Sequence, residues 1–247
     1  MVIDVLSIFP GMISPAVSES LLGKAVGDGL LGIEVHDIRS FTEDKHQVVD
    51  DAPFGGGPGM VMKVEPLYKG IKHCIDRHPN LRHRIMVTSA SGKRFDQKMA
   101  EDFSREEHLI VVCGRYKGVD ERIVDLFDIE EISVGDFVLT GGEAAALIII
   151  EATARLIPGY MSKFEAAETD SFTSGLLGYP EYTRPKEFMG LDVPEVLISG
   201  HHENIRKFRR KKSLEKTYRH RPELLDSAEL TEEDKNIIDE IKSKIDE

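Results

Sequence analysis

The sequence predicts an α/β protein with a mainly parallel sheet, and three observations support this class. With 247 residues, of which 40% are hydrophobic, the chain is long enough for a sizeable core. Over its first 160 residues, β-rich runs alternate with helical segments, as in βαβ units. Several of the turns between them contain glycine. Ligands of such sheets bind beyond the carboxyl ends of the strands, so we expect a site in these turns.

The alternation consists of short apolar runs and longer helical segments. We expect strands over residues 2–9, 31–38, 83–90, 108–114 and 131–139, the last of these leading into a loop. We expect helices over residues 65–78, 95–104, 119–127 and 142–157. The last of these helices is apolar on every side, which predicts that it is buried.

A change in composition at Pro158-Gly159 predicts the end of a first domain, residues 1–160. Residues 161–175 are polar and suit a linker. Residues 176–247 then form a smaller unit with a proline-containing loop, a basic helix and a final helix that Thr231 caps. Four isoleucines lie on one face of that final helix: Ile237, Ile238, Ile241 and Ile245.

The formal net charge of −12 argues against a general nucleic-acid binder, but the charge is segregated along the chain. Residues 206–221 carry nine Lys or Arg and one acidic residue, Glu215. Residues 226–247 carry nine Asp or Glu and three Lys. This pattern is compatible with a local polyanion site on an acidic protein.

The two cysteines, Cys74 and Cys113, have neither zinc-site spacing nor the number expected of a disulfide framework. The N-terminal run lacks a basic leader and meets Asp4 and Pro10 early, so it predicts a core strand and not a signal peptide. No apolar run approaches membrane length. We therefore expect a soluble, cytoplasmic protein without a membrane partner.

Three glycine-rich segments are candidate ligand loops. Residues 50–62 must form a loop, yet they match neither a dinucleotide fingerprint nor a P-loop, so a plain connection is an equal alternative. Residues 111–123 place Gly114 and Gly118 after a strand, where an ordinary βα loop is the alternative. The pair Gly141-Gly142 precedes an apolar helix, and we expect a ligand or another chain segment to approach its backbone closely.

Seven segments in order resemble the bacterial tRNA (guanine-N1)-methyltransferase family, TrmD, over nearly the whole chain. They are residues 46–62, 111–123, 133–143, 154–159, 168–177, 179–185 and 197–209. The resemblance implies a SPOUT-type parallel sheet with a deep C-terminal trefoil knot and a small, mainly α-helical C-terminal domain. This overrides the general expectation of an unknotted chain.

The resemblance also implies that S-adenosylmethionine binds in the knotted loops and that the enzyme is an obligate homodimer with composite active sites at the interface. The cofactor-binding positions that match are Ser89, Gly92, Gly114, Tyr116, Gly118, Val134, Gly135, Asp136, Phe137, Val138, Leu139, Gly141 and Gly142. Some positions depart from the family's usual residues: Ser89–Gly92 reads SASG, Lys117 replaces Glu, Glu181 replaces His, and Gly178 occupies an often acidic position.

The reaction that the resemblance implies is methylation of N1 of the guanine immediately 3′ of the anticodon, in tRNAs where a guanine precedes it. Asp170 matches the general base for the N1 proton, and Arg155 matches a cation that stabilises charge on O6. Spacing alone would single out neither residue. Magnesium could serve the same end. The positions that match tRNA contacts are His46, Asp50, Gly59, Arg184, His201, His202, Arg206, Lys207 and Arg210.

Three other functions compete with this expectation. A SPOUT methyltransferase for another RNA would not be expected to carry this C-terminal domain. An RNA-binding module without catalysis would not need Asp170 and Arg155. A binder of a small molecule other than RNA leaves the basic segment at residues 206–221 unexplained.

Overall fold

The computed structural model describes residues 1–161 and 170–245. The chain divides into two compact units, Met1–Ser162 and Lys163–Glu247, which are described separately.

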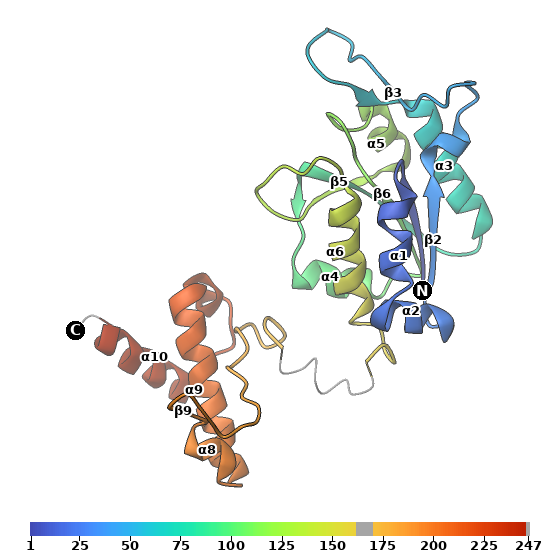
Figure 1. Ribbon diagram of the computed structural model, residues 1–247. Helices are drawn as coiled ribbons and strands as arrows, with labels where there is room; N and C mark the ends of the chain where they lie inside the picture. The colour runs from blue at the N-terminus through green and yellow to red at the C-terminus, as the bar shows by residue number, and fades with distance from the viewer. Residues whose placement is uncertain (162–169, 246–247) are drawn as a thin grey trace. The chain divides into compact units, whose positions relative to one another are not determined.

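A five-stranded, wholly parallel sheet forms the centre of the first unit (Figure 1). Its spatial order is β2-β1-β6-β5-β7, and every pair of neighbours is parallel. The strands are β1 (Val2–Ser7), β2 (Gly32–Asp37), β5 (His83–Arg94), β6 (His108–Val112) and β7 (Glu130–Ser133). The predicted α/β class with a parallel sheet is therefore confirmed.

Helices cover both faces of the sheet because strand side chains alternate between two apolar cores. Val5, Leu109 and Met86 belong to the core under α1 (Ser14–Val17), α2 (Ser20–Gly27), α4 (Gln97–Phe103) and α6 (Glu143–Ala154). Leu6 and Ile110 belong to the core under α3 (Val64–Arg77) and α5 (Glu121–Phe127).

Local side chains define several helix starts. The Asp96 carboxylate accepts a hydrogen bond from Met99 N at 2.9 Å and begins α4, and Asp120 accepts one from Arg122 N at 3.1 Å and begins α5. The predicted helices at 95–104 and 119–127 are thereby confirmed with shorter bounds. Two 3-10 turns, Pro10–Met12 and Ile38–Phe41, follow β1 and β2.

Two details of the first unit differ from the sequence expectations. The loop at residues 50–62 is closed at its base by an antiparallel pair, β3 (Asp50–Asp51) and β4 (Val61–Met62). Helix α6 is not buried on all sides, since the Ile148 side chain is 49% exposed. Within this unit, only the side of α6 that faces the sheet and α4 is covered. Burial within one chain therefore does not explain the apolar residues on the other sides of α6.

The second unit contains a short hairpin and helices around a small core. The hairpin is β8 (Glu187–Phe188) with β9 (Leu191–Asp192), and the helices are α8 (Glu195–Ile198), α9 (His202–His220) and α10 (Glu232–Ile245), with a 3-10 turn at Pro222–Asp226. The buried core consists of Leu176, Leu214, Ile238 and Ile241. Thr231 caps α10 as predicted, because its hydroxyl accepts a hydrogen bond from Asp234 N at 3.2 Å.

Candidate functional site

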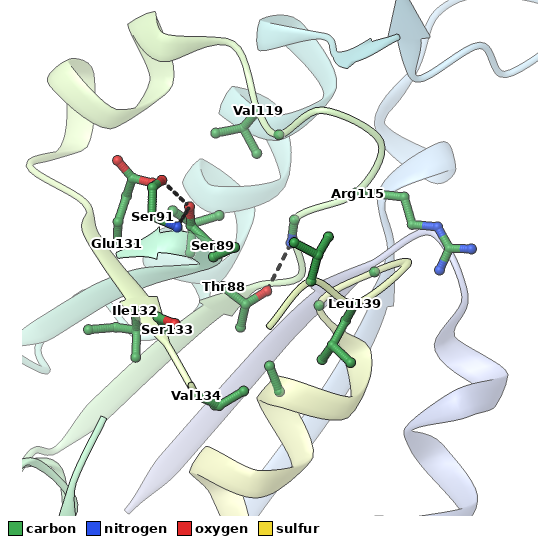
Figure 2. A pocket seen from close by; sticks show the side chains of 18 of the residues that line it. Thr88, Ser89, Ser91, Arg115, Val119, Glu131, Ile132, Ser133, Val134 and Leu139 are labelled. Atoms are coloured by element: carbon green, nitrogen blue, oxygen red, sulfur yellow. Dashed lines mark hydrogen bonds between the residues drawn. The ribbon is translucent and has the colours of Figure 1, made fainter. Parts of the chain in front are cut away.

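A cavity of about 480 Å³ lies at the carboxyl ends of β5, β6 and β7. Three segments line it: the bulge at residues 89–91, the loop at 114–119 and the loop at 133–142. The bulge interrupts β5, because Thr88 and Lys93 both pair with Ile132. Figure 2 shows Thr88 at the edge of the bulge, Val119 of the middle loop and Leu139 of the third loop around the same space.

Most of the expected cofactor positions line this cavity. They are Ser89, Gly114, Tyr116, Gly118, Val134, Gly135, Phe137, Val138, Leu139, Gly141 and Gly142. Gly92 and Asp136 do not line it. Gly92 packs against the backbone of Glu131 and Ile132, where an added Cβ would overlap both, so its role is to let two chain segments approach. Asp136 is exposed.

The glycine pair at the start of α6 makes room for another part of the chain. A Cβ on Gly142 would overlap the Thr88 hydroxyl and lie 2.9 Å from Gly114 N. The same hydroxyl accepts a hydrogen bond from Gly114 N at 3.1 Å, and Gly142 N donates to Gly114 O at 2.8 Å (Figure 2). Three separate segments therefore meet at Gly142.

A buried polar network holds the two larger loops together. Glu143, 1% exposed, accepts hydrogen bonds from the Ser7 hydroxyl at 2.8 Å and from Arg115 Nη1 at 3.2 Å. Arg115 also stacks on the Phe9 ring and forms an isolated β-bridge with Gly141. Because a buried carboxylate is costly unless it is paired, Arg115 and Glu143 constrain each other and the loops that carry them.

The loop at residues 50–62 contacts the middle loop of the cavity. Lys117 N donates to Met60 O at 3.0 Å, and the aliphatic part of the Lys117 side chain lies against Gly59. Burial and the neighbouring carboxylate of Asp50 raise the pKa of the Tyr116 phenol. Asp50 and Gly59 thus lie beside the cavity, whereas His46 is exposed on the preceding loop.

The two expected catalytic residues belong to different units. Arg155 is the C-cap of α6, and Asp170 is an exposed residue of the second unit. The cavity does not include Arg155 or Asp170 among its lining residues. Their roles stay predictions.

The remaining positions expected to bind tRNA lie on the second unit and are mostly exposed. Arg184 precedes the hairpin, and His201 caps α9, followed by His202. Arg206 pairs with Glu203 at 2.7 Å and Lys207 with Glu233 at 3.8 Å, all four side chains being at least half exposed.

Arg210 differs from these residues, because it makes a bidentate ion pair with the buried Asp234 of α10. Two other pairs also join the basic and acidic helices, Lys207 with Glu233 and Lys211 with Glu240. The acidic C-terminal segment therefore neutralises one face of the basic helix, which the segregation of charge alone did not indicate.

Among the polar residues of the cavity that are not expected cofactor positions are Thr88, Ser91 and Glu131. Ser91 Oγ donates to Glu131 Oε2 at 3.2 Å and lies 2.8 Å from Ser89 Oγ. The sequence feature that could have pointed to Thr88 is its position as a polar residue at the end of a buried apolar run. That signal is weak, since a threonine is also common in an ordinary strand.

A parallel sheet with a ligand-sized cavity beyond its strand ends defines a ligand-binding α/β protein. A sequence model of the family "tRNA (Guanine-1)-methyltransferase TrmD" matches residues 1–227. Proteins named tRNA (guanine-N(1)-)-methyltransferase from Geotalea uraniireducens, Moorella thermoacetica and Listeria innocua are 49%, 48% and 46% identical, respectively. These matches cover 97–98% of this chain and 96–98% of the relatives. The chain belongs to the TrmD family of tRNA (guanine-1)-methyltransferases.

Proposed function

We propose that this protein transfers a methyl group from S-adenosylmethionine to N1 of the guanine immediately 3′ of the anticodon, in tRNAs where a guanine precedes that base. Family membership and the names of the relatives support the tRNA methyltransferase reaction. The observation that carries the proposal is the cavity at the strand ends, which most of the family's matching cofactor positions line.

The cavity suits a nucleoside cofactor. At Gly135, Gly141 and Gly142 the space that a Cβ would need is taken by the side chains of Phe137, Arg115 and Thr88, so these glycines let the walls of the cavity pack closely. Phe137, Val138 and Leu139 supply apolar surface that is exposed in the unliganded chain. Bound S-adenosylmethionine supplies the electrophilic methyl group, and these residues would hold it.

The residues of this chain have to activate and orient the acceptor. Guanine N1 carries a proton at neutral pH, and Asp170 accepts that proton as a general base. Loss of the proton moves negative charge onto O6, where Arg155 stabilises it. Alignment of donor and acceptor supplies much of the rate, and the target base leaves its stack to reach the site.

Contacts with tRNA come from both units. Asp50 and Gly59 lie beside the cavity and His46 is exposed on the preceding loop. Arg184, His201, His202, Arg206 and Lys207 are exposed on the second unit. Phosphate contacts from Arg184, Arg206 and Lys207 position the anticodon stem. Arg210 holds α10 through Asp234, so it supports the tRNA-binding helix in addition to any phosphate contact.

The proposal includes a homodimer, a trefoil knot and a cytoplasmic location. The close crossings at Gly92, Gly114 and Gly142 support threading of the chain through these loops. The exposed apolar face of α6 at Ile148 supports burial against a second subunit that completes the active site with its own second unit. No helix within residues 1–161 and 170–245 is long and apolar enough to cross a membrane.

Magnesium dependence receives less support from this site. Lys117 puts a cation on the cavity lining where the family usually has a carboxylate. Among the described residues, no group of three metal-ligating side chains lies at the cavity. We therefore derive no step through a magnesium ion.

The test uses labelled S-adenosylmethionine and two tRNA transcripts that differ only in the base before the target guanine. We expect label at N1 only when that base is guanine, and a loss of at least about 100-fold in rate with Asp170→Ala, as for removal of a general base. Asp226→Ala, a change at an exposed carboxylate of the same unit, is the control and keeps its activity. Equal labelling of both transcripts would overturn the specificity, and full activity of Asp170→Ala would overturn the assigned base.

A further inference from the structure

A cluster of histidines around a buried carboxylate lies between α3 and the sheet. Asp4 of β1 is fully buried, and its two carboxylate oxygens lie 2.7 Å from His36 Nε2 and 2.9 Å from His108 Nε2. Cys74 of α3 is also fully buried. One donor atom each of Asp4, His36 and Cys74 lies within 4.8 Å of the others.

A fourth donor next to this group lacks a partner. His78 Nε2 is buried and has no hydrogen-bond partner among the described residues. It lies 4.0 Å from Asp4 Oδ2, and its ring packs edge-on against His108. A buried, unsatisfied ring nitrogen costs free energy, so a ligand that fills this space would be stabilised.

The cluster is separate from the cofactor cavity. None of its residues is among those that line the cavity, which lies at the carboxyl ends of the strands. His108, in contrast, is the first residue of β6, and Asp4 precedes the end of β1 by three residues. The methyl-transfer proposal uses none of these side chains.

We propose that Asp4, His36, Cys74 and His78 bind a divalent cation of the Zn²⁺ class. Carboxylate, imidazole and thiolate are the ligands that Zn²⁺ takes, usually four in number. The Asp4 carboxylate and a Cys74 thiolate would balance the two positive charges, so the buried site becomes neutral overall. His108 Nε2 then holds Asp4 through the carboxylate oxygen Oδ2, as residues that hydrogen-bond to a metal ligand commonly do.

The four donors must move closer before they can share one cation, because His78 lies outside the group whose donor atoms are within 4.8 Å of one another. Tetrahedral coordination at the usual Zn–N and Zn–O lengths separates ligand atoms by roughly 3.3 Å. The 2.7 Å contact between His36 and Asp4 must therefore open by about half an ångström as the cation replaces their shared proton. His36 lies on the edge strand β2 with 11% of its side chain exposed, which offers an entry path.

Co²⁺ is the probe for this site, because it reports thiolate ligation spectroscopically. The purified chain is treated with a chelator, desalted and titrated with Co²⁺ and then with Zn²⁺. We expect a thiolate-to-cobalt charge-transfer band that saturates at one Co²⁺ per chain and is abolished by one equivalent of Zn²⁺. We also expect Zn²⁺ to raise the melting temperature of the chain.

Cys74→Ala and Cys113→Ala form a matched pair, since both thiols are fully buried in the same unit. We expect Cys74→Ala to lose the band and Cys113→Ala to keep it. His78→Gln weakens Co²⁺ binding at least tenfold while circular dichroism confirms that it folds. A chain without the band, or a band that persists in Cys74→Ala, would overturn the proposal, because the cluster would then be a metal-free hydrogen-bonded network or the metal would bind elsewhere.

Discussion

The cavity loops and the second unit are each stabilised by a different kind of interaction. Around the cavity, close backbone approaches dominate, as where Gly142 meets Thr88 and Gly114. In the second unit, side-chain ion pairs join α9 to α10, and the buried hydrophobic core among its described residues consists of four side chains. The shape of the cavity therefore depends on close packing of its loops. The stability of the proposed tRNA-binding unit depends on a small core and on ion pairs, whose strength changes with salt and pH.

A substitution in the small core of the second unit should have the largest effect on stability. Leu214 of α9 is fully buried among Leu176, Ile238 and Ile241. We expect Leu214→Ala to destabilise the second unit by about 4 kcal/mol, enough to unfold it while the parallel sheet persists. Hydrogen exchange of amides in α10 and in β6 measures the two units separately. Equal loss of protection in both would show that the units unfold together.

Steric fit at the cavity predicts the next largest effect. In Gly142→Ala the added methyl overlaps the Thr88 hydroxyl, so we expect a loss of about 3 kcal/mol and abolished cofactor binding. Denaturant unfolding and calorimetric titration with S-adenosylmethionine measure these. Gly27→Ala is the control, because a Cβ there contacts nothing within 4 Å and a helical alanine changes stability by about 1 kcal/mol or less. Cofactor binding by Gly142→Ala would contradict the fit.

Acid should weaken the second unit through Asp234. Its hydrogen bond from Arg210 lowers the pKa of this carboxyl to about 2, below its unfolded value. The resulting stabilisation is present above about pH 4 and disappears as pH falls through about 2, a change of about 2 kcal/mol. Asp234→Asn should remove this stabilisation at neutral pH. The rate of amide hydrogen exchange in α10 should then depend less on pH than in the unsubstituted chain. An unchanged slope in that variant would assign the acid sensitivity to other carboxyls.

Replacement of Lys207 should weaken tRNA binding while changing stability least of the substitutions considered. Its ion pair with Glu233 is long and exposed, so Lys207→Ala should change stability by less than about 0.5 kcal/mol. Affinity for tRNA should nevertheless fall, and the salt dependence of binding should lose about one phosphate contact. Lys235→Ala, on α10, is the control that keeps both. An unchanged salt slope would exclude Lys207 from the interface.

The alternation of β-rich runs with helical segments predicted the parallel sheet, because strands such as β1 and β6 are buried on both faces and therefore appear as nearly continuous apolar runs. It did not predict that α6 has an exposed apolar face, since apolarity does not reveal which surface covers a helix. The glycine pair at 141–142 indicated a close approach, but only the structure identifies Thr88 as the residue that fills the space. The spacing of Cys74 could not reveal its neighbours, because Asp4 and His36 come from other elements.

The backbone contact between residues 60–62 and 117–119 joins the loop that carries Asp50 and Gly59 to a loop of the proposed cofactor cavity. Lys117 N bonds Met60 O, and Met62 N bonds Gly118 O, each at 3.0 Å. A ligand that orders one of these loops therefore orders the other, and such linkage is reciprocal. If the cofactor raises tRNA affinity tenfold, bound tRNA must raise cofactor affinity tenfold, a shared coupling free energy of about 1.4 kcal/mol.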